Sequence, residues 1–540
     1  MRRQMLSLTA ALAAAASLAL PTAAADAAPS PAVADVPVVV PASSPDVLHL
    51  GRWDRSAAAS TTVSSGSRMI LRFTGAHIAL LLDQSGITLP PQVYAAIDGA
   101  PPVLVSANSN RIDLTPAALP AGAHELVLAV KDVDEGGNRW NPPLRSALRV
   151  TGFEIDPGAT STPSPAPTGP RIEFLGDSIT QGVRALNTQP GVTGSDATKG
   201  FAWLTGNAFG GNFRQVGFGA QGLTRPGNGN VPVVSASLTS NYRGSPIDPT
   251  YVPDAVVINQ GANDALANTN PTTFRTAYEA YLRQVRALWP NAWIFAMRPF
   301  GGHMAASVAA AVPAVGDPRI VYVDTTGWVP RLQTTDDLHP SVVGHQNAAR
   351  RLVKVIERRT GWQAADIDRA RAGLLALGGP RGFEGSGAVT WQAGQNVSAA
   401  APGTPAYEGS TALQVTSAAA PLGEWRTIDL TARAHLSTKA QEIFAFVRPV
   451  PARALDVRLR VVRGGRVYES AVSALPNLAA FIPWNRVAVA VLGQGRVTDV
   501  SVSVRAAGGT STTPGLVSFV VDDLGWTDTA TALTSIPVPG

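Results

Sequence analysis

One segment limits how this chain can fold: residues 159–170 contain only Ala, Thr, Ser, Pro and Gly. Such a segment behaves as an extended linker, because proline cannot continue a helix or a central strand. The 540 residues are also too many for a single hydrophobic core. We therefore expect separate domains on either side of a linker at 158–170.

The overall composition is that of a globular chain with many turns. Hydrophobic residues make up 45% and charged residues 15%, with 51 Gly and 43 Pro, which excludes an intrinsically disordered protein. The absence of cysteine excludes disulfides, thiol nucleophiles and cysteine-ligated zinc.

The net charge of +5 is mild for this length. The densest basic group has helical spacing and predicts a solvated helix face rather than a nucleic-acid site; it consists of Arg350, Arg351, Lys354, Arg358 and Arg359. A weak attraction to anionic cell-wall polymers is compatible with this charge.

The N-terminus has the pattern of a signal peptide over residues 1–27. Arg2 and Arg3 precede the apolar run Leu6–Leu20, and small residues suited to cleavage follow at 23–27. The run is short for a membrane anchor, so we expect cleavage and a secreted, extracellular or cell-wall-associated protein. The arginine pair leaves Sec and twin-arginine export as alternatives. No later segment is apolar enough to predict a membrane span.

Two regions have the short, turn-punctuated apolar runs of antiparallel β-sandwiches. We expect a disordered lead-in at 28–44 and a first sandwich at 45–157, with strands near 69–73, 78–82, 93–97 and 125–130. After a connector at 363–380, a second, jelly-roll-like sandwich is expected at 381–530, with a tail at 531–540. Period-two alternation at 457–461 and 500–504 supports it.

The second sandwich is rich in tryptophan. Trp391, Trp425, Trp484 and Trp526 fit two alternatives: rings that stack on sugars in a carbohydrate-binding module, or core residues of a structural module.

Residues 171–362 alternate between buried strands and helices, which predicts an α/β/α sandwich around a parallel sheet. Strands are expected at 172–175, 213–216, 255–258, 293–297 and 320–323, and helices include 273–288 and 342–358. In such sheets, sites lie at the carboxyl ends of the strands.

Three polar segments stand out: two lie just after predicted strands, and the third lies between the last predicted strand and the last predicted helix. Gly176-Asp177-Ser178 follows the first strand, where a serine at a tight strand-to-helix turn can expose its hydroxyl. Asn263, shortly after the third strand, can direct an amide N–H at an oxyanion. Asp336, three residues before His339, can orient the imidazole as a base toward a serine. Taken singly, each segment is also explained as a helix cap or a turn.

Together the three segments resemble the signature blocks of the SGNH/GDSL hydrolase superfamily: Gly-Asp-Ser, Gly-x-Asn-Asp and Asp-x-x-His-Pro. The resemblance implies a flavodoxin-like fold and a triad of Ser178, His339 and Asp336, with Asp337 a weaker rival for the acid. It also implies an oxyanion hole made by the Ser178 and Gly222 backbone N–H groups and the Asn263 side chain. Gly219 is the alternative glycine, because Gln221 stands where the family often has serine.

The first sandwich adds a narrower resemblance. Segments 51–54, 72–75 and 96–99, followed by a Gly-Asp-Ser-Ile-Thr hydrolase domain, look like carbohydrate esterase family 2, which removes acetyl groups from plant polysaccharides such as xylan and glucomannan. Some members of that family lack the triad acid. The resemblance implies a serine esterase acting on acetylated carbohydrate or another small ester, with no metal, organic cofactor or nucleic acid. The alternatives are a lipase or acyl esterase of cell-envelope esters, and a non-catalytic wall-binding protein.

Overall fold

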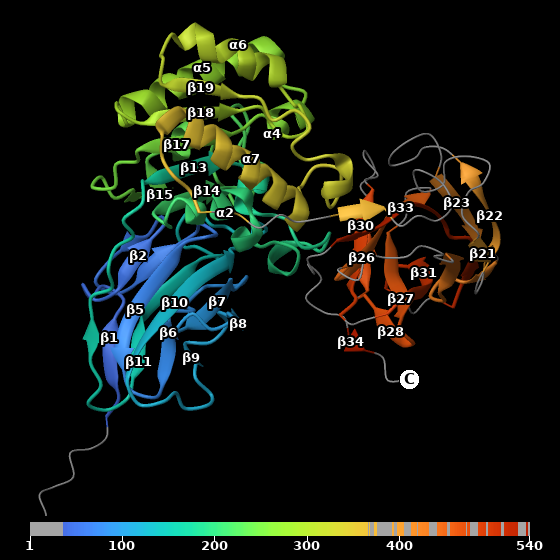
Figure 1. The fold of residues 1–540 in the computed structure, drawn as a ribbon, viewed down its shortest axis with the longest axis horizontal. Helices are drawn as coiled ribbons and strands as arrows, with labels where there is room; N and C mark the ends of the chain where they lie inside the picture. Colours follow the sequence, from blue (N-terminus) through green and yellow to red (C-terminus); the bar gives the residue numbers. More distant parts are fainter. Residues whose placement is uncertain are drawn as a thin grey trace, which may run out of the picture.

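The computed structural model describes three groups of sheets, arranged as separate lobes (Figure 1). The residues it describes are 36–365 and 367 and, in the C-terminal part, 372–374, 391–393, 397–403, 412–417, 419–430, 440–450, 454–470, 472–475, 484–492, 495–508, 512–527 and 536–537. The expected signal peptide at 1–27 lies outside them.

The first lobe is a sandwich of two antiparallel sheets. One sheet has the order β3-β4-β11-β6-β9 with β1 on β11, and the other has the order β12-β5-β10-β7-β8 with β2 on β5. The strands are β1 (Val38–Pro41), β2 (Leu48–Leu50), β3 (Asp54–Arg55), β4 (Ser60–Thr62), β5 (Arg68–Thr74), β6 (Ile78–Leu82), β7 (Gln92–Ile97), β8 (Val103–Ser106), β9 (Arg111–Asp113), β10 (Ala123–Asp132), β11 (Leu148–Ile155) and β12 (Ser161–Thr162). Alternate residues of these strands, such as Met69, Leu71 and Phe73, are buried between the sheets.

Two strands lie where irregular chain is expected. Residues 36–44 are not a structureless lead-in, because Val38–Pro41 pairs with β11 from Ile155 to Gly152. The β-branched valines suit an edge strand there. Part of the linker also pairs: Ser161 and Thr162 lie opposite Phe73 and Arg72 of β5.

The middle lobe is a parallel sheet of order β14-β13-β17-β18-β19. Its strands lie within one residue of the predicted segments: β13 (Ile172–Gly176), β14 (Phe213–Gly217), β17 (Ala255–Asn259), β18 (Trp293–Met297) and β19 (Ile320–Val323). The lobe also has the hairpin β15 (Ser240–Tyr242) and β16 (Ser245–Pro246) and three short 3₁₀ turns, η1 (Gly191–Thr193), η2 (Ala197–Lys199) and η3 (Arg331–Gln333).

Helices cover both faces of this sheet. They are α1 (Ser178–Gln181), α2 (Phe201–Ala208), α3 (Val234–Ser237), α4 (Ala262–Leu266), α5 (Pro271–Leu288), α6 (Ala305–Val315) and α7 (Val342–Thr360). Val256 and Ile258 pack with α5 and α6 on one face, whereas Val257 and Phe295 pack with α2 and α7 on the other. Among the described residues, no helix has both the length and the apolar character needed to cross a membrane.

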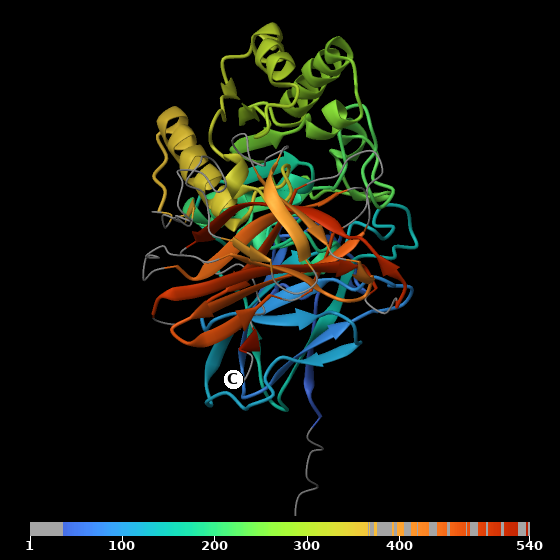
Figure 2. The same ribbon diagram turned by 90° about the vertical axis from the view of Figure 1, so that its right-hand side faces the viewer.

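The third lobe is again a sandwich, seen in front in Figure 2. Its described sheets have the orders β22-β23-β33-β26-β30, with β20 on β33, and β21-β25-β31-β27-β28-β34, with β29 on β27; β24 pairs with β32. The strands are β20 (Ala372–Leu374), β21 (Trp391–Ala393), β22 (Val397–Gly403), β23 (Ala412–Ser417), β24 (Ala420–Pro421), β25 (Arg426–Leu430), β26 (Glu442–Val450), β27 (Leu455–Arg463), β28 (Arg466–Glu469), β29 (Ser473–Leu475), β30 (Asn485–Ala490), β31 (Val497–Ala506), β32 (Pro514–Gly515), β33 (Ser518–Thr527) and β34 (Ile536–Pro537).

The tryptophans of this lobe differ in their surroundings. Trp484 is buried and Trp526 packs against the core, so these two fit the structural alternative. Trp425 is half-buried, with the guanidinium carbons of Arg458 and Arg505 at 4.5 and 4.4 Å from its ring centre. The side chain of Trp391 lies outside the described residues.

Buried polar contacts join the first two lobes. Arg52 Nε donates to Glu173 Oε1 on β13 at 2.8 Å, its Nη2 lies 2.6 Å from the same oxygen in an ion pair, and both side chains are almost fully buried. Gln181 of α1 donates to Asp132 Oδ1 at 2.9 Å. The strand and helix around Ser178 are thus supported directly by the first sandwich.

We expect Glu173→Gln to destabilise this two-lobe unit by about 3–5 kcal/mol, because it leaves the buried Arg52 charge without its carboxylate. Urea unfolding monitored by tryptophan fluorescence would measure the loss. The matched control is Glu125→Gln, which breaks the exposed Arg72–Glu125 pair and should cost at most about 1 kcal/mol. Equal effects of the two substitutions would contradict the expectation.

Candidate active site

Ser178 stands at a sharp turn between β13 and α1. Asp177 caps the helix by accepting the Ile179 N–H at 3.0 Å, and Gly182 ends it in a left-handed conformation. A Cβ at Gly176 would lie 1.9 Å from Thr180 Oγ1, so only glycine permits this close approach of strand and helix. As the first residue of α1, Ser178 has a backbone N–H with no acceptor inside the helix.

Asp336 and His339 lie on a tight turn that precedes α7. The Thr335 N–H donates to the His339 carbonyl at 2.7 Å, and Thr334 forms a β-bridge with Pro340. Ser341 then caps α7 by accepting the Gly344 N–H. We call residues 334–340 the acid–base turn.

A continuous hydrogen-bond chain joins three predicted residues. His339 Nε2 lies 2.9 Å from Ser178 Oγ, and His339 Nδ1 lies 3.0 Å from both oxygens of Asp336. The three residues are only 4–7% exposed. A carboxylate only accepts hydrogen bonds, so Nδ1 carries the proton and Nε2 is left to accept from the serine hydroxyl.

The charge state of Asp336 follows from its neighbours. Burial alone would raise the pKa of Asp336, but His339, the Arg184 guanidinium and the His339 backbone N–H together hold this pKa well below its ordinary value. Asp336 is therefore ionised across the range in which enzymes ordinarily work.

Asp337, the rival candidate for the acid, forms an ion pair away from the imidazole. Its carboxylate lies 2.9 Å from Arg331 Nη2, and its backbone has φ 69°. The structure thus brings Asp336, and not Asp337, into contact with the imidazole.

Asn263 lies beside the serine turn, on α4. Gly261, with φ 131°, reverses the chain after β17, and Asn263 Nδ2 donates to Gln221 O at 3.0 Å and to Asp177 Oδ2 at 3.3 Å. Its amide therefore faces both the segment after β14 and the residue before Ser178.

The backbone N–H groups of both candidate glycines donate hydrogen bonds within the protein. The Gly222 N–H donates to Arg225 O at 3.1 Å, and the Gly219 N–H donates to Gln181 Oε1 at 3.2 Å. Of the two glycines, Gly222 is linked more directly to Asn263, because the Asn263 amide donates a hydrogen bond to the carbonyl of the adjacent residue, Gln221. The choice of Gly222 stays a prediction.

Sequence reasoning missed Asp264. Its carboxylate accepts the backbone N–H groups of Leu223 and Thr224 at 3.0 and 2.8 Å and so fixes the segment that carries Gly222. A Cβ at Gly222 would lie 2.5 Å from Asp264 Oδ2, which explains the glycine. The adjacent pair Asn263-Asp264 was the available signal.

His345 is a structural residue. It is fully buried in α7, and its Nδ1 accepts the Phe201 N–H at 3.1 Å. Burial, with the nearby His339, lowers the pKa of His345 to about 3, so this ring stays neutral.

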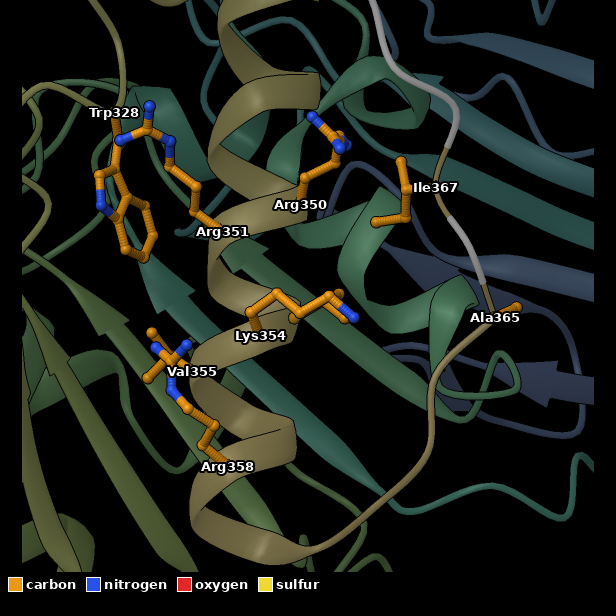
Figure 3. A pocket seen from close by; sticks show the side chains of 9 residues that line it. Trp328, Arg350, Arg351, Lys354, Val355, Arg358, Ala365 and Ile367 are labelled. Atoms are coloured by element: carbon orange, nitrogen blue, oxygen red, sulfur yellow. The ribbon is translucent and has the colours of Figure 1, made fainter.

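A hollow of about 440 Å³ lies on the outer side of α7 (Figure 3). None of the three hydrogen-bonded residues above lines it. Its lining is Trp328, Arg350, Arg351, Val353, Lys354, Val355, Arg358, Ala365 and Ile367. Arg351, Lys354 and Arg358 are exposed there, as the solvated-face interpretation predicts. Among the residues that the structure describes, no group of three His, Cys, Asp or Glu side chains is placed to hold a metal ion.

Comparison with known families identifies the middle lobe. Residues 174–346 match the model of the GDSL-like lipase/acylhydrolase family. This region belongs to that family. The match spans Ser178, Asn263 and His339 and confirms the predicted GDSL/SGNH serine hydrolase domain.

Relatives extend the likeness beyond this domain. The cellulase/esterase CelE of Acetivibrio thermocellus is 28% identical over 340 residues, which are 59% of this chain and 40% of CelE, so the match spans less than half of that protein. An active-site mutant of a family two carbohydrate esterase from Clostridium thermocellum is 27% identical, with TM-score 0.50, over 59% of this chain and all of that one. A family two carbohydrate esterase from Cellvibrio japonicus shares the fold, with TM-score 0.51 and 18% identity. These relatives agree with the resemblance to carbohydrate esterase family 2.

We expect Asn263→Ala to lower kcat by about 10²–10³-fold, the usual cost of one lost oxyanion donor. KM should change little, because the donor acts on the transition state. Steady-state kinetics on p-nitrophenyl acetate would test this. An unchanged kcat would make Asn263 a turn residue only.

Separate Asp336→Asn and Asp337→Asn variants would test the register of the acid–base turn. We expect Asp336→Asn to lower kcat by about 10⁴-fold, because the imidazole loses both its orienting acceptor and its counter-charge. Asp337→Asn should change kcat by less than about threefold, since the carboxylate of Asp337 pairs with Arg331. The reverse order of effects would show that Asp337 is the acid. If both variants stayed active, the enzyme would use a Ser-His dyad.

Proposed function

We propose that this chain is a secreted serine esterase that deacetylates acetylated polysaccharide. The observation that carries the proposal is the buried hydrogen-bond chain from Ser178 Oγ through His339 to Asp336. We assign Ser178 as nucleophile, His339 as general base and Asp336 as the acid that orients it.

The reaction is acyl transfer in two halves. Ser178 Oγ attacks the ester carbonyl carbon while its proton moves to His339 Nε2, which gives a tetrahedral intermediate. The bond from carbon to the alkoxy oxygen then breaks, and the alcohol leaves with the proton from Nε2. Water attacks the acyl-enzyme with His339 again as base, and collapse releases the carboxylic acid and restores Ser178.

The oxyanion would be held by the Ser178 N–H, the Gly222 N–H and the Asn263 amide. In the resting structure Asn263 makes a longer bond to Asp177, 3.3 Å, than to Gln221, 3.0 Å. The longer bond is the weaker and is the one we expect to yield to the oxyanion. Gln221 would then keep the amide in orientation.

Three observations support the choice of substrate. The similar proteins named above are a cellulase/esterase and family two carbohydrate esterases. Their match to this chain extends well beyond residues 174–346, to 59% of its length. Residues 1–27 have the pattern of a secretory signal, which fits a polysaccharide substrate outside the cell.

A substrate panel on the full chain would test this proposal. It comprises acetylated xylan and glucomannan, and p-nitrophenyl esters from acetyl to long acyl chains. We expect release of acetate from the polysaccharides and a fall in rate with acyl length. Preference for long chains would favour a lipase, and binding without turnover would favour a non-catalytic protein.

Ser178→Ala should lower kcat by about 10⁶-fold with the fold intact, because no other group here can form the acyl-enzyme. A fluorophosphonate probe should label the native chain at Ser178 only, as read by peptide mass spectrometry. Full activity of the variant, or labelling elsewhere, would refute the assignment.

A further inference from the structure

Arg184 has an unusual backbone. It lies two residues after Gly182, which ends α1, and has φ 53°, in the left-handed region that is disfavoured for residues with a Cβ. Such a conformation persists where surrounding contacts hold it, and it often marks a functional position. Two contacts hold this one: the Arg184 N–H donates to Ser195 Oγ at 3.3 Å, and its guanidinium reaches the acid–base turn.

The guanidinium contact falls on the triad acid itself. Arg184 Nη1 lies 2.5 Å from Asp336 Oδ2, and the arginine side chain is 26% exposed while that of Asp336 is 4% exposed. Asp336 Oδ1 accepts the His339 backbone N–H at 2.9 Å. Both oxygens lie 3.0 Å from the imidazole Nδ1, and Oδ2 is the one that also accepts from Arg184.

We propose that Arg184 is a positioning residue that fixes Asp336 and, through it, tunes His339 as a base. This rests on the proposed roles of Ser178, His339 and Asp336. The ion pair locks the rotation of the carboxylate, which in turn locks the imidazole against Ser178 Oγ. The same positive charge repels the positive charge that develops on the imidazole when it takes the serine proton.

Other charged groups near the imidazole are few among the described residues. Asp177, on the serine turn, is fully buried, and burial raises its pKa to about 7. His345, on α7, stays neutral for the reason given above. Asp264 acts on Asp177 from α4. All three are unchanged in an Arg184 variant, so a difference from the native pH profile reports on Arg184.

The test uses the full chain with Arg184→Gln, Arg184→Lys and Arg184→Gly, assayed on p-nitrophenyl acetate from pH 4 to 9. Arg184→Gln should lower kcat by about 10–100-fold, the scale for a loosened catalytic geometry. KM should stay within about twofold, because substrate binding is not the affected step. The acid limb of the kcat/KM profile should move to higher pH by about one unit, since a nearby positive charge is lost.

The other two variants separate chemistry from folding. Lysine keeps the charge but not the planar fork, so Arg184→Lys should keep the acid limb near its native position with only partial kcat. Glycine suits φ 53°, so Arg184→Gly should melt at a higher temperature than Arg184→Gln and still lose activity as Arg184→Gln does. A fully active Arg184→Gly variant would overturn the proposal.

Two controls complete the design. Arg331→Gln breaks the neighbouring pair with Asp337 on the same turn and should leave both kcat and the acid limb unchanged. In an Asp336→Asn background, Arg184→Gln should change kcat by less than about twofold, because the partner is already altered. Equal losses in Arg331→Gln, or additive losses in the double variant, would refute a specific role of Arg184. If Ser178→Ala stayed active, the proposed function itself would fail, whatever Arg184 does.

Discussion

The site depends on the position of β13 between β14 and β17 in the parallel sheet. In this register Gly176 lies opposite both Gly217 and Asn259. The three strands therefore end side by side, and the segments that follow them start from one edge of the sheet. Ser178, the Gly222 segment and Asn263 come together because parallel pairing aligns strand ends that are far apart in the sequence.

Hydrogen bonds between these segments then remove their freedom. Asn263 ties the segment after β14 to the serine turn, and Asp264 accepts the backbone N–H groups of Leu223 and Thr224 in that segment. Donors held in this way need little reorganisation when negative charge develops beside them.

The sequence predicts the sheet and the residues of this chain of contacts well, because strand periodicity and motif spacing are local signals. The five strands of the middle lobe fall within one residue of their predicted limits, and the structure joins Ser178, His339 and Asp336 by hydrogen bonds. Arg184 could not be predicted in the same way. Its partner Asp336 lies 152 residues away, and no local pattern marks an arginine in a left-handed conformation.

The strand at Val38–Pro41, in the expected lead-in, shows that local sequence signals also limit how much of the fold can be predicted. Val38, Val39 and Val40 have the composition of a strand, but only β11, more than a hundred positions later, supplies an edge to pair with. Without knowledge of that edge, a short valine run beside Ala, Pro and Ser reads as irregular chain. Local propensity was therefore present, and the missing information was tertiary.

The acid–base turn is held from two sides. On the inside, Arg184 fixes the Asp336 carboxylate. On the outside, the backbone N–H of Arg486, on strand β30 of the third lobe, donates to the Thr335 carbonyl at 2.8 Å. Because β30 is at the end of its sheet's strand order, its outward N–H groups need partners from elsewhere, and Thr335, next to Asp336, provides one. The Arg486 side chain is itself buried against Glu442 and the ring of Phe444, so this contact comes from a residue that is packed within the sandwich. Because contacts on both sides hold the acid–base turn, the backbone of the turn does not have to keep the imidazole directed at the serine by itself.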